Sequence, residues 1–305
     1  MGRLESGLTA LGLSPVAIAE LAGDASRRRF YRVTLRDGAT VVAALYPEAL
    51  AEAARADHAA QLWGLEHGLP IPRALGRSGA VVVSEDLGDE DLEAAVATRG
   101  AGVVELALDA LATFQTCAWA DLATPPFDAP FFRRELAVFE EHALDADAES
   151  DAEVMGYLDD LADALAGHPF RLVHRDFHLN NLLLFAGRAW AVDYQDMRGG
   201  PDTYDLVSLL RERAGAALPD EERRAARAAA RFGWAPGWER RYLECAAQRG
   251  LKVVGTFLRL AAAGRPAYLR WLPVVHARTC AALEALGAPA KLRGALATSP
   301  DLRGL

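Results

Sequence analysis

The chain has 305 residues, 51% of them hydrophobic and 25% charged, a composition typical of globular proteins with one large or two modest domains. Its 42 acidic residues outnumber the 33 basic ones, which argues against a nucleic-acid partner. It contains neither the roughly 18-residue apolar run of a membrane span nor a signal peptide, and its three distant cysteines suit reduced thiols. We therefore expect a cytoplasmic monomer without membrane partners.

Residues 1–87 are predicted to form a small α/β lobe. The runs 28–35 and 39–45 are rich in β-forming residues and flank Asp37-Gly38, which predicts a β-hairpin. A helix is expected from Pro47 to about His67. Two short strands should follow near 74–77 and 80–83, and then a connector at 85–89.

Residues 88–305 are predicted to form a larger, mainly helical lobe. Helices are expected at 90–98, 103–118, 130–144, 151–166, 201–216, 219–232, 237–262 and 267–286. The β-like island at 170–193 holds a hairpin formed by 182–185 and 189–192, whereas the acidic stretch 144–153 should be a solvated loop. The fold class is thus α+β, with a small antiparallel-sheet lobe before a helical lobe.

The densest chemical signal is LVHRDFHLNNLLL at 172–184, followed by AVDYQD at 191–196. Phosphoryl transfer needs a carboxylate that orients the attacking hydroxyl, and oxygen ligands that hold Mg²⁺ on the nucleotide phosphates. Asp176 suits the first role, and Asn181 and Asp193 suit the second. The spacing therefore favours a kinase that uses ATP and Mg²⁺.

Each of these residues also has a simpler interpretation. Asp176 alone could be a turn residue, Asn181 a cap and Asp193 an acid at a strand end. His174 is expected to be structural, with its side chain hydrogen-bonded to the loop backbone. A metal hydrolase is a further alternative, with His174, Asp176 and His178 as ligands and His168, Asp193 and Asp196 as the nearby additional candidates.

The run HRDFHLNNLLL with the later VDYQD resembles the aminoglycoside phosphotransferase and choline kinase superfamily, which has a protein-kinase-like bilobal fold and uses ATP and Mg²⁺ to phosphorylate hydroxyls of small molecules. Three further segments resemble one branch of it, the anomeric N-acetylmuramate and N-acetylglucosamine kinases of cell-wall sugar recycling. These segments are GDASRRRFYRV (23–33), SEDLG (84–88) and DYQDMRGGPDTYDLVSLLRE (193–212).

The resemblance implies a role for each matching residue. Asp176 is the expected catalytic base, and Asn181 and Asp193 are the expected Mg²⁺ ligands. The implied nucleotide-binding residues are Gly23, Asp24, Ala25 and Ser26 over the phosphates and Glu85, Asp86 and Leu87 at a hinge beside the adenine. Asp205 would brace the catalytic loop, although an acid in the first turn of a helix is an equally open interpretation.

On the acceptor side, Gln195 and Asp196 directly follow Asp193 and should face the substrate cleft, where an amide and a carboxylate suit sugar hydroxyls or an acetamido group. Glu135 resembles a residue bordering this cleft, but a solvated helix face remains an alternative. The aromatic residues Trp234, Trp238 and Tyr242 are expected to pack in the core.

Kinases of this fold usually carry a lysine on the third strand, which here falls near Ala43 or Ala44. The chain has only two lysines, Lys252 and Lys291, and none before residue 252. Arg28, Arg29 and Arg32 are the obvious substitutes, and the period of a strand places Arg28 and Arg32 on one face. Since a guanidinium can hold two phosphate oxygens, we expect Arg28 or Arg32 to bind the phosphates, with a solvated basic edge as the alternative.

Glu52 and Asp57 are the candidates for the partner acid on the first long helix, although the missing lysine leaves open whether such an ion pair forms. Together these features predict a small-molecule kinase acting on a sugar, with the anomeric hydroxyl of an N-acetylated hexosamine as the expected acceptor. An amino alcohol or aminoglycoside kinase is one alternative, for which Glu135, Glu140, Glu141 and Asp196 would supply an acidic cleft. A nucleotide-binding pseudokinase is another, suggested by the missing lysine.

Overall fold

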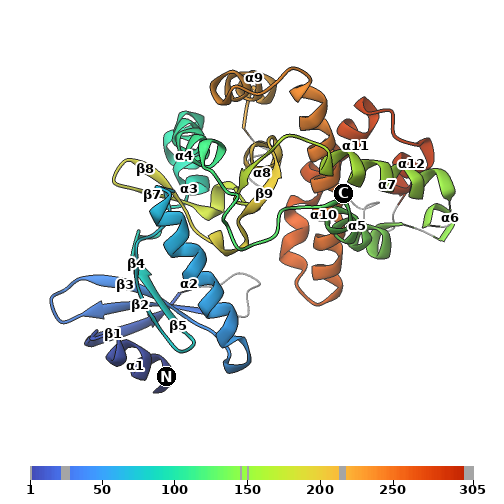
Figure 1. The fold of residues 1–305 in the computed structure, drawn as a ribbon. Coiled ribbons are helices and arrows are strands. Elements are labelled where there is room, and N and C mark those ends of the chain that lie inside the picture. The colour runs from blue at the N-terminus through green and yellow to red at the C-terminus, as the bar shows by residue number, and fades with distance from the viewer. Residues whose placement is uncertain (1, 22–27, 145, 150, 213–217, 299–305) are drawn as a thin grey trace.

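The computed structural model describes residues 2–21, 28–144, 146–149, 151–212 and 218–298. An antiparallel sheet with two helices lies at one end, and a larger helical region makes up the rest (Figure 1). The predicted α+β bilobal architecture is therefore confirmed, whereas the boundary between residues 87 and 88 stays a prediction. Among the described residues, no helix combines the length and apolar character needed to cross a membrane.

The N-terminal sheet has five strands in the order β1-β2-β3-β5-β4. Their bounds are β1 Pro15–Glu20, β2 Arg29–Leu35, β3 Thr40–Leu45, β4 Ala74–Ser78 and β5 Val81–Glu85. The predicted hairpin forms around Asp37-Gly38, where Gly38 has a φ of 84° that glycine adopts without steric cost. The strand β1 and the helix α1 (Gly2–Ala10) were not predicted.

The two faces of this sheet have different neighbours. On one face, Leu4 and Leu8 of α1 pack with Tyr31, Val33 and other alternate strand residues. On the other face, Ala54 of α2 (Ala51–Glu66) packs with Ala44 and Val82. Because strand side chains alternate, Arg28, Phe30 and Arg32 fall on this second face, which also lines the main cavity.

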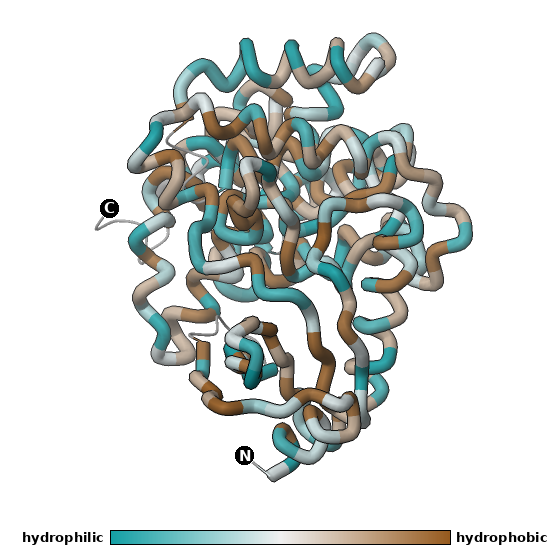
Figure 2. The backbone as a smooth tube through the Cα atoms, turned by 90° about the vertical axis from the view of Figure 1, so that its left-hand side faces the viewer, coloured by the Kyte–Doolittle hydropathy of each residue, from teal (hydrophilic) through white to brown (hydrophobic). Residues whose placement is uncertain are grey.

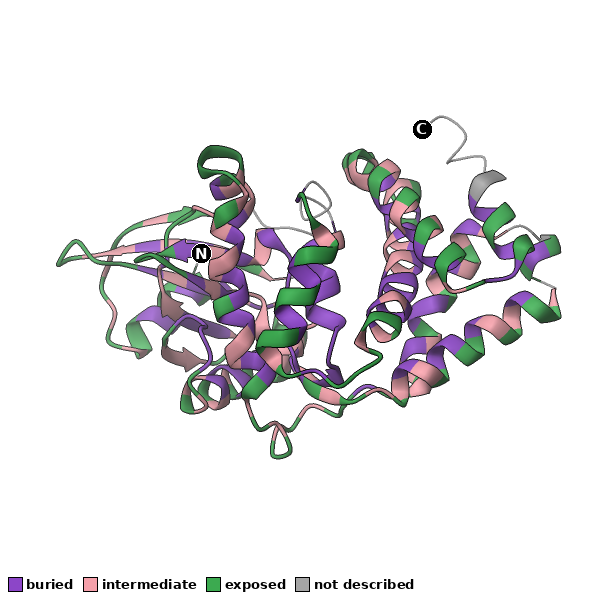
Figure 3. Ribbon diagram, turned by 90° about the horizontal axis from the view of Figure 1, so that it is seen from above, coloured by how far each residue is buried: buried purple, intermediate pink, exposed green. Residues whose placement is uncertain are grey.

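The C-terminal region is built from the helices α3 to α12. Their bounds are α3 Leu92–Arg99, α4 Val104–Thr116, α5 Ala129–Ala143, α6 Ala146–Glu149, α7 Ala152–Ala166, α8 Tyr204–Arg211, α9 Glu221–Phe232, α10 Trp238–Ala262, α11 Leu272–Ala285 and α12 Ala290–Thr298. The loop expected at 144–153 is wrong in part, because α6 forms there and buries Ala148. Hydrophilic and hydrophobic residues alternate along the helices (Figure 2), and buried residues alternate there with exposed ones (Figure 3).

Helices α5 and α10 approach each other closely at Gly255. A Cβ atom added there would lie 2.6 Å from the backbone of Phe139, so only glycine permits this contact. The contact places Glu135 of α5 opposite Gln248 and Lys252, which lie one helical turn apart on α10. This packing therefore assembles part of the site described below.

Two strand pairs position the chemical motif. The predicted hairpin is present as β7 (Leu182–Phe185) and β8 (Arg188–Ala191), whereas the pair of β6 (Phe170–Val173) with β9 (Arg198–Pro201) was not predicted. As β9 occupies residues 198–201, helix α8 begins at Tyr204 rather than at residue 201. The loops 174–181 and 192–197 are held between these pairs.

Candidate active site

The loop that follows β6 is fixed by a buried carboxylate. Asp205, in the first turn of α8, is completely buried and accepts hydrogen bonds from the backbone N–H groups of His174 (2.6 Å) and Arg175 (3.0 Å). Arg175 has a φ of 81°, and Arg249 of α10 donates to its carbonyl oxygen over 2.7 Å. These contacts hold a backbone conformation that a non-glycine residue rarely adopts, directly before Asp176.

Asp176 lies in a field of positive charge. Its side chain is about a third exposed, and desolvation alone would raise its pKa; the charges of Lys252, Arg249 and Arg175 outweigh this effect and lower the pKa of Asp176 well below its usual range. Among these cations, Arg249 forms an ion pair with Asp176, with 3.9 Å between Arg249 Nη2 and Asp176 Oδ1. Asp176 is therefore a carboxylate near neutral pH and can accept a hydrogen bond from a hydroxyl.

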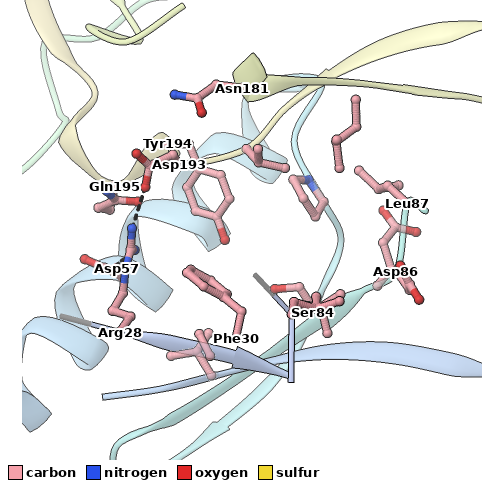
Figure 4. Close-up of a pocket in the computed structure, with 18 of the residues that line it drawn as sticks. Arg28, Phe30, Asp57, Ser84, Asp86, Leu87, Asn181, Asp193, Tyr194 and Gln195 are labelled. Atoms are coloured by element: carbon pink, nitrogen blue, oxygen red, sulfur yellow. Dashed lines mark hydrogen bonds and ion pairs between the residues drawn. The ribbon is translucent and has the colours of Figure 1, made fainter. Parts of the chain in front are cut away.

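Asn181 and Asp193 present oxygen atoms to the same cavity. The amide nitrogen of Asn181 donates to the backbone carbonyl of Asp176 over 2.9 Å, which leaves its amide oxygen for another partner. Asp193 has a left-handed backbone with a φ of 64°, and its Oδ1 accepts a hydrogen bond of 2.9 Å from Gln195. Figure 4 shows Asn181 on the far side of the pocket from Arg28.

Arg28 joins the two lobes across this pocket. Its Nη1 lies 3.0 Å from Asp57 of α2, and its Nη2 forms an ion pair with Asp193 (Figure 4). The hydroxyl of Tyr46 donates to Asp57 and accepts from Arg28 over 3.3 Å. Arg28 therefore pairs with the acid of the long helix, which is Asp57 and not Glu52, as Glu52 pairs with Arg55.

The other two arginines of the predicted trio have different surroundings. Arg32 lines the cavity, but its guanidinium is held by Asp86 and Asp89, with contacts of 2.6 to 3.0 Å. Arg29 points to the outer side, where its exposed side chain pairs with Glu20 over 2.7 Å. Of the three, only Arg28 approaches Asp193.

The cavity between the lobes has a volume of about 670 Å³. Its apolar wall suits a flat aromatic ring and includes Leu21, Phe30, Val42, Ala44, Val82, Leu87, Leu183 and Val192. The three predicted hinge residues, Glu85, Asp86 and Leu87, all line it, and the carboxylate of Asp86 holds Arg32. Gly23, Asp24, Ala25 and Ser26 lie outside the described residues.

The predicted acceptor residues do not form an acidic cleft. The side chain of Glu135 is only 9% exposed, so the solvated-face alternative is wrong; its carboxylate contacts Arg175 (3.1 Å), Lys252 (3.0 Å) and Gln248 (3.1 Å). Asp196 pairs with Arg175 over 3.1 Å, and Glu140 pairs with Arg133. Only Gln195 of the predicted acceptor pair lines the cavity, beside Asp193.

His174 is structural in a different way from that expected. Its ring is completely buried and packs edge-on against Phe114 and Phe177, with centroids 5.8 Å away in each case, and neither ring nitrogen has a hydrogen-bond partner. The expected side-chain hydrogen bond is therefore wrong: the loop is held through the backbone N–H of His174. Among the described residues, no three His, Cys, Asp or Glu side chains form a group that could hold a metal ion, so the ligand trio of the hydrolase alternative is not assembled.

The expectation that the aromatic cluster belongs to the core is confirmed. Trp234 and Tyr242 are buried, and the partly buried Trp238 packs against the core and against Trp234. Three site residues were not predicted from the sequence: Arg175, Lys252 and Arg249, which surround Asp176 with positive charge. The unusual rarity of lysine offered a signal for Lys252, since one of only two lysines in the chain lies at the site.

We expect Asp205→Ala to destabilise the protein by about 2–4 kcal/mol, because two buried backbone N–H groups lose their acceptor. Burial raises the pKa of Asp205 to about 6, above that of an unfolded aspartate, so its stabilising contribution is largest at low pH and falls as pH rises through 6. Urea unfolding should therefore show that the difference in unfolding free energy between the wild type and Asp205→Ala is about 1 kcal/mol greater at pH 5 than at pH 7.5. An unchanged unfolding free energy would contradict the bracing role.

The sequence is similar to those of known proteins. The sequence profile of the phosphotransferase enzyme family matches residues 17–244. The chain is 30% identical over 281 residues to the N-acetylmuramate/N-acetylglucosamine kinase of Pseudomonas aeruginosa, a match covering 85% of this chain and 81% of that protein. It is 29% identical over 202 residues to the protein of the same name from Neisseria meningitidis, where the match covers 63% of this chain and 60% of the relative, less than two thirds of its length.

Solved structures resemble the whole fold. A choline/ethanolamine kinase family protein from Mesorhizobium loti has a TM-score of 0.65 at 17% identity, covering 97% of each chain. A thermostable mutant of an aminoglycoside phosphotransferase, solved in a ternary complex with ADP and hygromycin B, has a TM-score of 0.64 at 18% identity, covering 93% of this chain and 98% of that one. These likenesses concern the fold, and they confirm the kinase-like architecture expected from the motifs.

Proposed function

The chain belongs to the phosphotransferase enzyme family, and from this premise we propose that it transfers the γ-phosphoryl group of ATP to the anomeric hydroxyl of N-acetylmuramate or N-acetylglucosamine. The observation that carries the proposal is the convergence of Asp176, Asn181 and Asp193 on one cavity, with an apolar wall between the lobes. The curated relatives support the choice of acceptor.

Asp176 is proposed as the residue that receives the proton of the acceptor hydroxyl. Its carboxylate is kept ionised by Lys252, Arg249 and Arg175, and the loop that carries it is held by Asp205. A carboxylate placed in this way can orient the hydroxyl for in-line attack on the γ-phosphorus. The adenine ring would lie in the cavity against the apolar wall, beside the hinge residues Glu85 to Leu87.

Asn181 and Asp193 fit a magnesium site. The hydrogen bond from Asn181 to Asp176 leaves an amide oxygen facing the pocket, and Asp193 contributes a carboxylate. Magnesium is commonly held by one or two such protein oxygens together with substrate phosphates, and it neutralises charge on those phosphates when bound. Arg28 lies beside Asp193 and is proposed to hold phosphate oxygens in the absence of a lysine on β3.

The surroundings of Asp176 favour a neutral or anionic acceptor over an amino alcohol or an aminoglycoside. A cationic substrate would need unpaired acids, but Glu135, Glu140 and Asp196 all have arginine partners. The positive charges that lower the pKa of Asp176 would also repel an ammonium group.

The test is an acceptor panel with MgATP that contains N-acetylmuramate, N-acetylglucosamine, choline and kanamycin, with ADP release as the readout. We expect turnover with the two sugars and none above background with choline or kanamycin. Turnover with choline or kanamycin alone would overturn the proposed acceptor. ADP binding without turnover of any acceptor would instead support the pseudokinase alternative.

A further inference from the structure

Three guanidinium groups surround one aromatic ring next to the candidate catalytic loop. The Cζ atoms of Arg134, Arg175 and Arg198 lie 5.5, 5.5 and 5.0 Å from the centre of the Phe131 ring. These residues come from α5, from the loop after β6 and from β9, so separate parts of the chain converge here. We call Arg134, Arg175, Arg198 and Lys252 the cationic cluster.

The cationic cluster is not fully neutralised by its neighbours. Its carboxylate partners are Glu135, which contacts Arg175 and Lys252, and Asp196, which contacts Arg175 at 3.1 Å and Arg198 at 3.5 Å. Arg134 has no ion pair within the described part of the chain and is exposed. Four cations thus face two carboxylates, or three with Asp176, in a chain whose net charge is -9.

Two further observations indicate that positive charge is crowded at this point. Burial and the charge of Arg175 both lower the pKa of Arg198, which is the opposite of what a well-paired arginine shows. The Nε atom of Arg175 is buried and has no hydrogen-bond partner in the structure. An anion that approached this surface would relieve the repulsion between these side chains.

The cluster also adjoins Asp176, the residue proposed to receive the proton of the acceptor hydroxyl. Arg175 immediately precedes Asp176, and both Arg175 and Lys252 act on the carboxylate of Asp176. Asp196 and Arg198 follow Gln195, which lines the cavity beside Asp193. A substrate whose hydroxyl reached Asp176 would therefore experience the positive charge of Arg175 and Lys252.

We propose that the cationic cluster binds a carboxylate of the acceptor, with Arg134 and Arg198 as the residues that select a carboxylated sugar over its neutral counterpart. This inference rests on the proposed function. The two proposed acceptors differ in this respect, since N-acetylmuramate carries a lactyl carboxylate that N-acetylglucosamine lacks. A planar guanidinium matches a carboxylate in a two-pronged hydrogen bond.

The experiment compares kcat/KM for N-acetylmuramate and N-acetylglucosamine in the wild type, R134Q, R198Q and R198K. We expect R198Q to lower kcat/KM for N-acetylmuramate about tenfold, chiefly through KM, because it removes a charge-assisted contact. The ratio of kcat/KM for N-acetylmuramate to kcat/KM for N-acetylglucosamine should fall with it. This ratio should fall in part in R134Q and recover in R198K. The matched control is R188Q, since Arg188 likewise lies over an aromatic ring, Trp190, at 5.4 Å, but in the β7–β8 hairpin.

The outcomes separate this inference from the proposed function. If the wild type phosphorylates both sugars and the variants change them equally or not at all, the carboxylate site is wrong while the proposed function stands. If the wild type phosphorylates neither sugar, both are wrong. ADP affinity and the melting temperature show whether each variant is folded. Because Arg134 is exposed, R134Q tests the proposal without disturbing the buried contacts of Arg198.

Discussion

Replacement of Asp176 by asparagine should lower kcat by about a thousandfold, while KM for ATP changes by no more than about twofold. The amide has nearly the shape of the carboxylate but cannot take the proton of the acceptor hydroxyl. The loop should keep its conformation, because it is held by Asp205 and Arg249 through the backbone of His174 and Arg175. Steady-state kinetics with saturating acceptor and MgATP measures both parameters.

The matched control for this prediction is Asp196→Asn. Asp196 is a nearby carboxylate that pairs with Arg175, but it does not line the cavity. We expect it to retain far more of the wild-type kcat than the Asp176 variant. Wild-type kcat in Asp176→Asn would refute the role of Asp176, whereas a large rise in its KM for ATP would point to nucleotide binding instead.

Replacement of Arg28 by alanine should lower kcat/KM for ATP by about a hundredfold, the second largest effect expected. Arg28 reaches both Asp57 and Asp193, and it supplies positive charge in a small lobe without lysine. The variant removes the proposed phosphate contact and also leaves the carboxylate of Asp57 without its cation. Nucleotide-dependent kinetics, together with the melting temperature, separates the loss of phosphate binding from a loss of folding.

Arg29→Ala is the control for Arg28→Ala, because the two are sequence neighbours and Arg29 pairs with Glu20 on the outer side. We expect its ATP kinetics to match those of the wild type. Arg28→Lys should recover part of the loss, since it restores the charge without the planar guanidinium. Equal kinetics in Arg28→Ala and Arg29→Ala would contradict the proposed substitution of the missing lysine.

The convergence of the motif residues on one cavity could be predicted because its sequence signal is local. Asp176, Asn181 and Asp193 lie within 18 positions of one another, and short strands hold them in one place. The hairpin at Asp37-Gly38 could likewise be predicted, because these two adjacent residues identify its turn.

Most features that could not be predicted are contacts between segments that lie far apart in the sequence. Arg28 and Asp193 are 165 positions apart, and Arg249 reaches the carbonyl of Arg175 across 74 positions, so no local pattern reports either contact. Strand β9 was missed because RGGP reads as a turn, yet Gly199 is required there: a Cβ atom would lie 2.3 Å from the Trp119 side chain. The exposed strand β1 lacks the alternating pattern that identifies a half-buried strand.

The position of the phosphate in the product tests the proposed function most directly. ³¹P NMR of the reaction of the wild type with MgATP and N-acetylglucosamine should show a sugar phosphate whose phosphorus couples to the anomeric proton, formed in step with ADP. A phosphate coupled to the C6 protons, or ADP formed with inorganic phosphate alone, would contradict the proposal that the enzyme phosphorylates the anomeric hydroxyl.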